Sequence, residues 1–195
     1  MAVTVSSPAK SVNELVGLAK SSPGKVNYAA VLGGLPHLMG EMLKSARGLD
    51  IVMVPYKSTM DAQTDVLSGR VEIWFTTMAS ALPQVKAGKV RALGVAGEKR
   101  AAVLSEVPTM AEAGFPELDV NVGFFILTAA ATPKPIVNAL NSQIVKAIGA
   151  KEVSDRLTAA GVEPKSSSPE ELDALLKSEA ARWGKIAKES GIRVD

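Results

Sequence analysis

The chain's single histidine, His37, stands behind two glycines and a proline in the stretch Val31-Leu-Gly-Gly-Leu-Pro-His37. The run before Gly33 and Gly34 is apolar, and Pro36 suits the first turn of a helix. A helix that begins after a glycine turn leaves backbone N–H groups unpaired, and these groups bind anions together with the positive end of the helix dipole. A plain strand-to-helix connection needs the same glycines, and the spacing alone favours that simpler interpretation.

His37 has no serine or carboxylate at a recognisable partner spacing, so a histidine held by local hydrogen bonds is favoured over a catalytic one. The alternative is a small cytosolic α/β enzyme that uses His37 as acid or base and Lys57 as electrophile. The glycines match neither a Walker loop, which continues with Gly-Lys-Ser/Thr, nor a nucleophile elbow, which places a serine between its glycines.

Two further groups of polar side chains follow predicted strands. Tyr56 and Lys57 offer a hydroxyl and an ammonium group that can receive a carboxylate, or they form an ordinary loop with a packed ring and a solvated charge. Thr76 and Thr77 offer hydroxyls that can contact a ligand or cap the following helix. From the residues alone, both interpretations stay open for each pair.

Composition excludes several classes of function. The net charge of +2 is too small to indicate a nucleic-acid or anionic-membrane partner. The chain has no cysteine and one histidine, which excludes disulfides, thiolate chemistry and a histidine-rich metal site, and no cofactor is expected. The N-terminal residues show neither the basic start nor the apolar core of a signal peptide.

Short apolar runs alternate with amphipathic segments through the first half of the chain. This alternation predicts an α/β fold with a mostly parallel sheet covered on both faces, and ligands in such sheets bind at the carboxyl ends of the strands. The expected strands are 3–6, 26–31, 51–55, 71–75, 90–95 and 120–127, and the expected helices are 11–20, 36–47, 59–67, 80–87, 133–148, 151–160 and 168–190.

An ordered set of motifs resembles one family. The motifs are Pro8–Leu15, Val26–Ala29, Leu35–Leu38 with Gly40-Glu41, Val54–Lys57, Ser80–Pro83, Lys86–Val95, Val107–Gly114, and Arg182-Trp183 through Val194. Together they are similar to the periplasmic solute-binding proteins of tripartite tricarboxylate transporters, the Bug (TctC) family. The resemblance covers essentially the whole chain.

The resemblance implies a type 2 periplasmic-binding-protein-like fold, in which two α/β lobes trap a small carboxylate and deliver it to the transporter's membrane subunits without catalysis. Residues 4–121 would form one complete ligand-binding lobe, and residues 122–195 the C-terminal portion of the other. Strands 3–6 and 120–127 would cross between the lobes.

The resemblance also implies which residues contact the ligand. The loop of Val31, Leu32, Gly33, Gly34, Leu35 and His37 would hold one ligand carboxylate, and the Val54–Lys57 motif contributes Tyr56. Thr76 and Thr77 match a second contact loop, and Phe124 aligns near an aromatic residue at the hinge. Gly34 stands where many relatives have serine and Thr76 where aspartate is common, which should alter the choice of ligand.

By the same resemblance, the N-terminal part of the second lobe is expected to be absent, together with the secretion signal. The remaining part would then expose apolar surface, which favours a homo-oligomer or domain exchange. This expectation leaves open a third interpretation, a self-associating interaction module.

Overall fold

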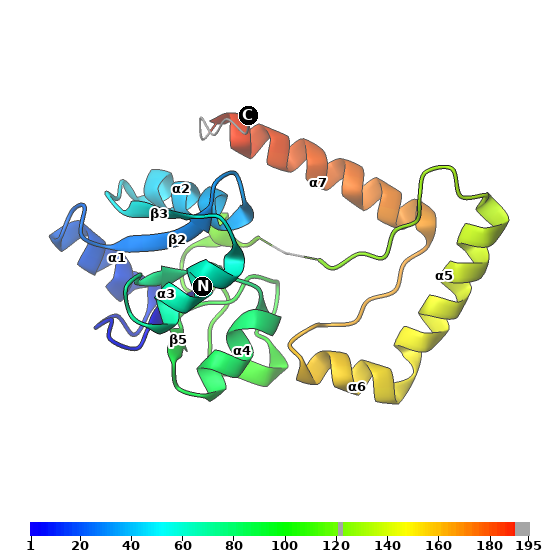
Figure 1. Ribbon diagram of the computed structural model, residues 1–195, viewed down its shortest axis with the longest axis horizontal. Helices are drawn as coiled ribbons and strands as arrows, with labels where there is room; N and C mark the ends of the chain where they lie inside the picture. Colours follow the sequence, from blue (N-terminus) through cyan, green and yellow to red (C-terminus); the bar gives the residue numbers. More distant parts are fainter. Residues whose placement is uncertain (121–122, 190–195) are drawn as a thin grey trace. The chain divides into compact units, whose positions relative to one another are not determined.

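The computed structural model describes residues 1–120 and 123–189 (Figure 1). The chain divides into two compact units, Met1–Asn121 with Ala187–Asp195, and Val122–Ile186. The first unit holds the sheet and the helices that cover it, and the second holds helices.

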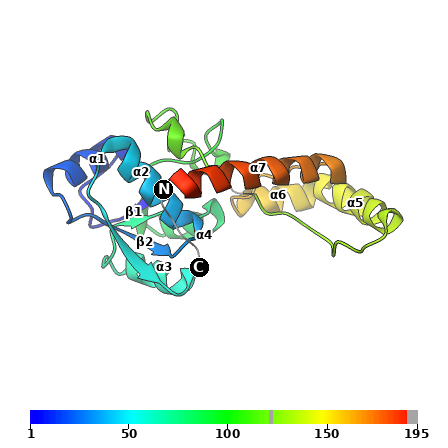
Figure 2. The same cartoon turned by 90° about the horizontal axis from the view of Figure 1, so that it is seen from above.

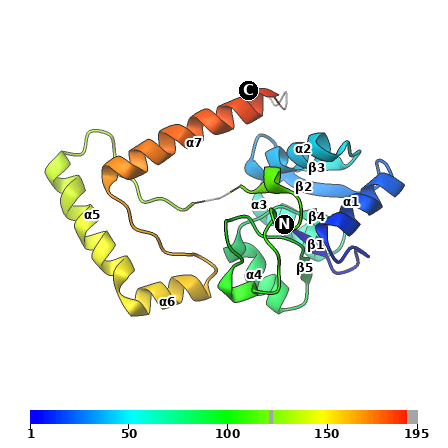
Figure 3. The same cartoon turned by 180° about the vertical axis from the view of Figure 1, so that it is seen from behind.

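The first unit is built on a five-stranded mixed sheet with the order β3-β2-β4-β1-β5. Strand β2 pairs in parallel with β3 and β4, whereas β1 runs antiparallel to both β4 and β5 (Figure 3). The prediction of a mostly parallel α/β sheet is therefore confirmed, with β1 as the strand that runs the other way. The strands are β1 (Ala2–Thr4), β2 (Asn27–Val31), β3 (Val52–Tyr56), β4 (Ile73–Trp74) and β5 (Val90–Ala92).

Helices α1 and α3 of the first unit begin at serine side chains that cap them. Ser11 accepts a hydrogen bond from the Glu14 N–H at the start of α1, and Ser58 accepts one from the Asp61 N–H at the start of α3. α2 begins after Gly34 without a side-chain cap, and it ends at Gly48, whose left-handed conformation suits glycine. These helices are α1 (Val12–Ser21), α2 (Leu35–Arg47), α3 (Thr59–Leu67) and α4 (Met78–Lys86).

Side-chain alternation along β2 distributes the core over the two faces of the sheet. Tyr28 and Ala30 pack with residues of α1 and α2, whereas Ala29 packs with residues of α3 and α4. Figure 2 shows α1 and α2 on one side of the strands and α3 on the other. Covered faces leave the strand ends as the part of the sheet that a ligand can reach.

After β5 the chain crosses the first unit in short elements. The 3₁₀ helices are η1 (Ala102–Leu104) and η2 (Pro116–Leu118), and Thr109 between them forms a parallel bridge with Val95, which precedes η1. Phe115 and Leu118 enter the core beside α2, with exposed fractions of 1% and 0%. This segment therefore closes the core of the first unit.

The second unit contains helices α5 (Lys134–Gly149) and α6 (Lys151–Ala159), drawn in yellow tones in Figure 1, and most of α7 (Pro169–Glu189). These helices form where the sequence predicts them. The predicted strand over 120–127 is wrong for Val120 and residues 123–127, which have no strand structure, while 121–122 lie outside the described residues. A strand needs a partner, and the described part of this unit offers none.

The described residues from 123 to 188 include no buried side chain. Phe124, Ile126 and Leu127 are 69%, 64% and 64% exposed, and Ile136 of α5 is 51% exposed. No helix in the described part of the chain is both long and apolar enough to cross a membrane. The second unit therefore has amphipathic helices without a hydrophobic core of their own.

Candidate functional site

The bend between β2 and α2 is a tight turn that requires glycine. The Gly34 N–H donates to the Val31 carbonyl at 2.9 Å, and Gly33 adopts a φ of 73°. A positive φ at the third residue of a four-residue turn is the geometry of a type II turn, which favours glycine at that place. The turn directs the chain from the carboxyl end of β2 into the first turn of α2.

Part of the hydrogen-bonding capacity of this bend is used internally. The Gly33 N–H donates to His37 Nδ1 at 3.1 Å, and the His37 N–H donates to the Gly34 carbonyl at 3.0 Å. The first N–H group of α2, that of Leu35, has no acceptor among the described residues. The bend is also open to solvent, because Leu32 is 63% exposed and its neighbours are partly exposed.

His37 stabilises the bend. Because Nδ1 accepts the Gly33 N–H, the neutral ring carries its proton on Nε2. In the described part of the chain no carboxylate is hydrogen-bonded to the imidazole. The ring is therefore held as the sequence favoured, by a local hydrogen bond, without the partner that an acid–base role needs.

The sheet register brings the other predicted site residues to the same edge. Tyr56 at the end of β3 pairs with Val31 at the end of β2. Trp74 of β4 pairs with Ala29, so Thr76, two residues further, follows β4 at the same edge as Val31. The carboxyl ends of three neighbouring strands thus meet beside the bend, as the sequence predicts for a parallel sheet.

Tyr56 lies at this edge, but its hydroxyl proton is engaged. The hydroxyl donates to Asp65 Oδ2 at 2.7 Å, and Asp65 also forms an ion pair with Arg70 at 2.7 Å. Burial, and then the hydrogen bond to Asp65, raise the pKa of Tyr56 to about 12. A ligand carboxylate would have to compete with Asp65 for the Tyr56 hydroxyl. The spacing of residues in the sequence did not reveal Asp65 as the partner of Tyr56.

This hydrogen bond predicts a measurable titration. Free tyrosine is half ionised near pH 10, whereas Tyr56 should ionise near pH 12. The protonated Tyr56 hydroxyl therefore stabilises the folded protein below about pH 10, and this stabilisation is lost as pH rises through 12. Asp65→Asn should lower the pKa of Tyr56 while the effect of burial remains. Tyrosinate absorbance against pH measures both, and Tyr56→Phe identifies the signal. Equal curves for wild type and Asp65→Asn would contradict the assignment.

The two threonines after β4 have different roles. Thr77 caps α4, because its hydroxyl accepts from the Ser80 N–H at 3.3 Å and donates to Ser80 Oγ at 3.1 Å. The Thr76 side chain is partly exposed, and no hydrogen bond of the described residues engages its hydroxyl. Phe124 belongs to the second unit, and its role at the ligand stays a prediction.

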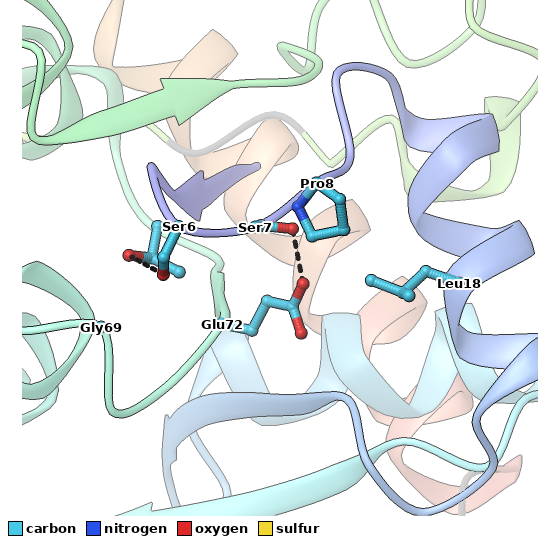
Figure 4. Close-up of a pocket in the computed structure, with 7 residues that line it drawn as sticks. Ser6, Ser7, Pro8, Leu18, Gly69 and Glu72 are labelled. Carbon is cyan, nitrogen blue, oxygen red and sulfur yellow. Dashed lines mark hydrogen bonds between the residues drawn. The ribbon is translucent and has the colours of Figure 1, made fainter.

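A polar pocket that sequence reasoning missed lies near the opposite ends of the strands, where Thr4 of β1 bonds the residue before β4. In Figure 4 the Ser7 hydroxyl points to Glu72, to which it donates at 2.5 Å. The hydroxyl oxygens of Thr4 and Ser6 are hydrogen-bonded at 3.3 Å. These polar side chains of the pocket are thus hydrogen-bonded to one another. The described residues contain no cluster of His, Asp or Glu side chains suited to a metal ion. The pocket is lined by Thr4, Ser6, Ser7, Pro8, Leu18, Gly69 and Glu72.

Comparison with known proteins assigns the chain to a family. The tripartite tricarboxylate transporter family receptor (TctC) matches residues 1–192. The chain belongs to the TctC family. This assignment confirms the resemblance seen in the sequence motifs, and because the family is one of solute-binding receptors, it sets aside the enzyme alternative built on His37 and Lys57.

Similar proteins agree with the assignment. A protein of the tcbD–tcbE intergenic region of Pseudomonas sp. strain P51 is 34% identical over 97% of this chain and 57% of its own length. The R. palustris protein Rpa4515, solved with adipate, is 34% identical with a TM-score of 0.89 over 98% of this chain and 64% of its own. A structure described as a periplasmic transporter is 36% identical with a TM-score of 0.90, covering 100% of this chain and 65% of its own.

The TctC fold is thus established as the α/β fold of periplasmic binding proteins. The chain spans 57% of the length of the Pseudomonas relative and about two thirds of the solved neighbours. This partial coverage of the solved neighbours is consistent with a chain that contains one lobe plus part of another.

Proposed function

We propose that this chain is the solute-binding part of a periplasmic TctC receptor, and that it holds a small carboxylate at the bend between β2 and α2. The observation that carries the proposal is the unused N–H group of Leu35 in the first turn of α2. Rpa4515, 34% identical and solved with adipate, supports a dicarboxylate as the ligand class.

The chemistry of the bend suits an anion. Carboxylate oxygens accept hydrogen bonds only, and backbone N–H groups at a helix N-terminus supply donors within a favourable electrostatic field. Gly33 and Gly34 carry no side chain that would block the approach of a carboxylate to the backbone. The Thr76 hydroxyl and the Nε2–H of His37 are further donors at or near this edge.

The remaining predicted contacts have secondary roles in this proposal. Val31 ends β2 and fixes the turn, Thr77 orients the loop by capping α4, and Tyr56 contributes only if the ligand displaces Asp65. Phe124 would contact the ligand from the second unit. No covalent step occurs, and the receptor would deliver the carboxylate to the transporter's membrane subunits.

The proposed roles of the two lobes follow the domain boundaries expected from the sequence. Residues 4–121 would form the ligand-binding lobe, and residues 122–195 would contribute to the facing lobe. Ligand binding by the first unit alone would be weak, because a receptor of this kind gains affinity when both lobes enclose the ligand.

Titration of the ¹⁵N-labelled protein with adipate tests the proposal, with acetate and n-butanol as probes of charge and of apolar contact. We expect adipate to shift the amide signals of Leu32, Leu35 and Thr76, and to leave those of Ser6 and Glu72 unchanged. Acetate should produce the same pattern at higher concentration, and n-butanol should not.

Gly33→Ala provides the mutational test. An alanine at the φ of Gly33 is strained by about 1–2 kcal/mol, so the turn changes and adipate affinity should fall at least about tenfold. Gly88→Ala is the matched control, because Gly88 also has a positive φ, 66°, and a Cβ there would meet open space. Equal adipate binding by both variants, or adipate shifts confined to other residues, would show that the bend is not the site.

A further inference from the structure

Helix α2 approaches β2 so closely at one point that only glycine fits. A Cβ built on Gly40 would overlap the ring atoms Cε2 and Cζ of Tyr28 and would lie 2.7 Å from its hydroxyl oxygen. Tyr28 has no exposed surface, so its ring cannot move out toward solvent. The ring also meets Phe75 edge-to-face, with centroids 6.0 Å apart. Gly40 therefore sets the distance between the helix and the strand.

The neighbouring residue ties the same two elements together. The Tyr28 hydroxyl donates to Glu41 Oε1 at 2.9 Å, and Lys44 Nζ donates to the same oxygen at 2.9 Å. Burial, and then the Glu41 carboxylate, raise the pKa of Tyr28, so the hydroxyl keeps its proton and remains a donor. A buried tyrosine on β2 is thus in contact with one residue of α2 and hydrogen-bonded to the next.

β2 and α2 are the two elements that hold the ends of the bend. Val31 ends β2, Leu35 begins α2, and His37 lies one turn before Gly40 on the same side of the helix. The bond from the Gly33 N–H to His37 Nδ1 spans the bend and depends on where the first turn of α2 lies. A displacement of the first turn of α2 relative to β2 would disturb this bond.

We propose that Tyr28 and Gly40 are positioning residues, which fix α2 against β2 so that His37 keeps its Nε2-protonated form and the bend keeps its shape. The consequence for ligand affinity rests on the proposed function, whereas the consequence for His37 does not.

The single histidine of the chain gives a ligand-free readout. Long-range ¹H–¹⁵N spectra of the imidazole distinguish an unprotonated Nδ1 from a protonated one. In the wild type we expect the Nε2–H form. In Gly40→Ala the Gly33 bond should be lost, so His37 should show a mixture of both neutral forms and the Gly33 amide signal should shift.

Gly17→Ala is the matched control, since Gly17 also lies inside a helix but a Cβ there has nothing within 4 Å. It should leave the His37 spectrum unchanged. The double variant Tyr28→Leu/Gly40→Ala removes the ring that the new methyl group would strike and should restore the Nε2–H form. If Gly40→Ala alone does not fold, Tyr28→Phe, which keeps the ring and releases Glu41, should show a smaller change of the same signals.

An unchanged His37 spectrum in folded Gly40→Ala, or in Tyr28→Phe where Gly40→Ala does not fold, would overturn the positioning role. Adipate titration separates this inference from the proposed function. A changed His37 spectrum with no adipate binding by the wild type leaves the positioning role intact and removes the carboxylate site. With both correct, Gly40→Ala should lower adipate affinity at least about tenfold, and the double variant should recover part of it.

Discussion

In dilute solution, the amide hydrogens of residues 123–186 are expected to exchange at least about a hundredfold faster than those of β2 and β4. The described residues of this unit include no buried side chain, and helices of 9 to 21 residues are marginal in water without packing. Strand β2, by contrast, lies between two strands and is covered on both faces. Hydrogen exchange followed by mass spectrometry of peptides measures the contrast.

Raising the protein concentration should slow exchange in the same residues, since we propose that a second copy of this chain covers their apolar surface. Light scattering should show an increase in mass over the same concentration range. Replacing Ile126 and Leu127 by serine should reduce association, whereas replacing the exposed Val52 of β3 by serine is the control in the first unit. A monomer at every concentration, with slow exchange throughout 123–186, would contradict both expectations.

Phe115→Ala should lower the free energy of unfolding of the first unit by about 3–5 kcal/mol, which is the usual effect of removing a buried phenylalanine. The ring is 1% exposed and lies in the core with residues of α1 and α2. The Arg47 guanidinium covers its face at 4.4 Å and also forms an ion pair with Glu117 at 3.0 Å. The variant therefore opens a cavity and removes the surface on which Arg47 rests.

Urea unfolding followed by Trp74 fluorescence measures this loss. Trp74 is 4% exposed in the first unit, and a Trp183→Phe background leaves it as the only tryptophan of the chain. Arg47→Ala should cost about 1 kcal/mol, because it removes a partly exposed cation–π contact and leaves the core filled. A Phe115→Ala effect no larger than that of Arg47→Ala would show that the 114–118 segment is not part of the cooperative core.

Local sequence rules predicted the elements of the first unit because each rule acts over a few residues. The caps at Ser11 and Ser58 and the glycine at 48 define helix ends without reference to the rest of the fold. The direction of β1 could not be predicted in this way. It is set by pairing with β4 and β5, whose residues lie far along the chain.

The short range of local sequence rules also explains which contacts at the candidate site were not predicted. The order of strands placed Val31, Tyr56 and Thr76 at one edge, as the α/β pattern predicts. The bond from Tyr56 to Asp65 depends on side-chain orientation across the β3–α3 connection, which spacing does not give. The strand expected over 120–127 did not form in its described residues, Val120 and 123–127, because an apolar run adopts strand structure only where another strand is available to pair with it.

The position of β1 inside the sheet has a consequence for the order of folding. Ala2 pairs with Trp74 on one side and with Ala92 on the other, so both neighbours of β1 in the sheet lie far along the sequence. Pairing β1 with β4 and β5 closes a long loop, and the conformational entropy of that loop is lost before the contacts form, which slows folding. During synthesis, β1 can pair with β4 once Ile73–Trp74 has left the exit tunnel, but its other edge stays unpaired until Val90–Ala92 has followed.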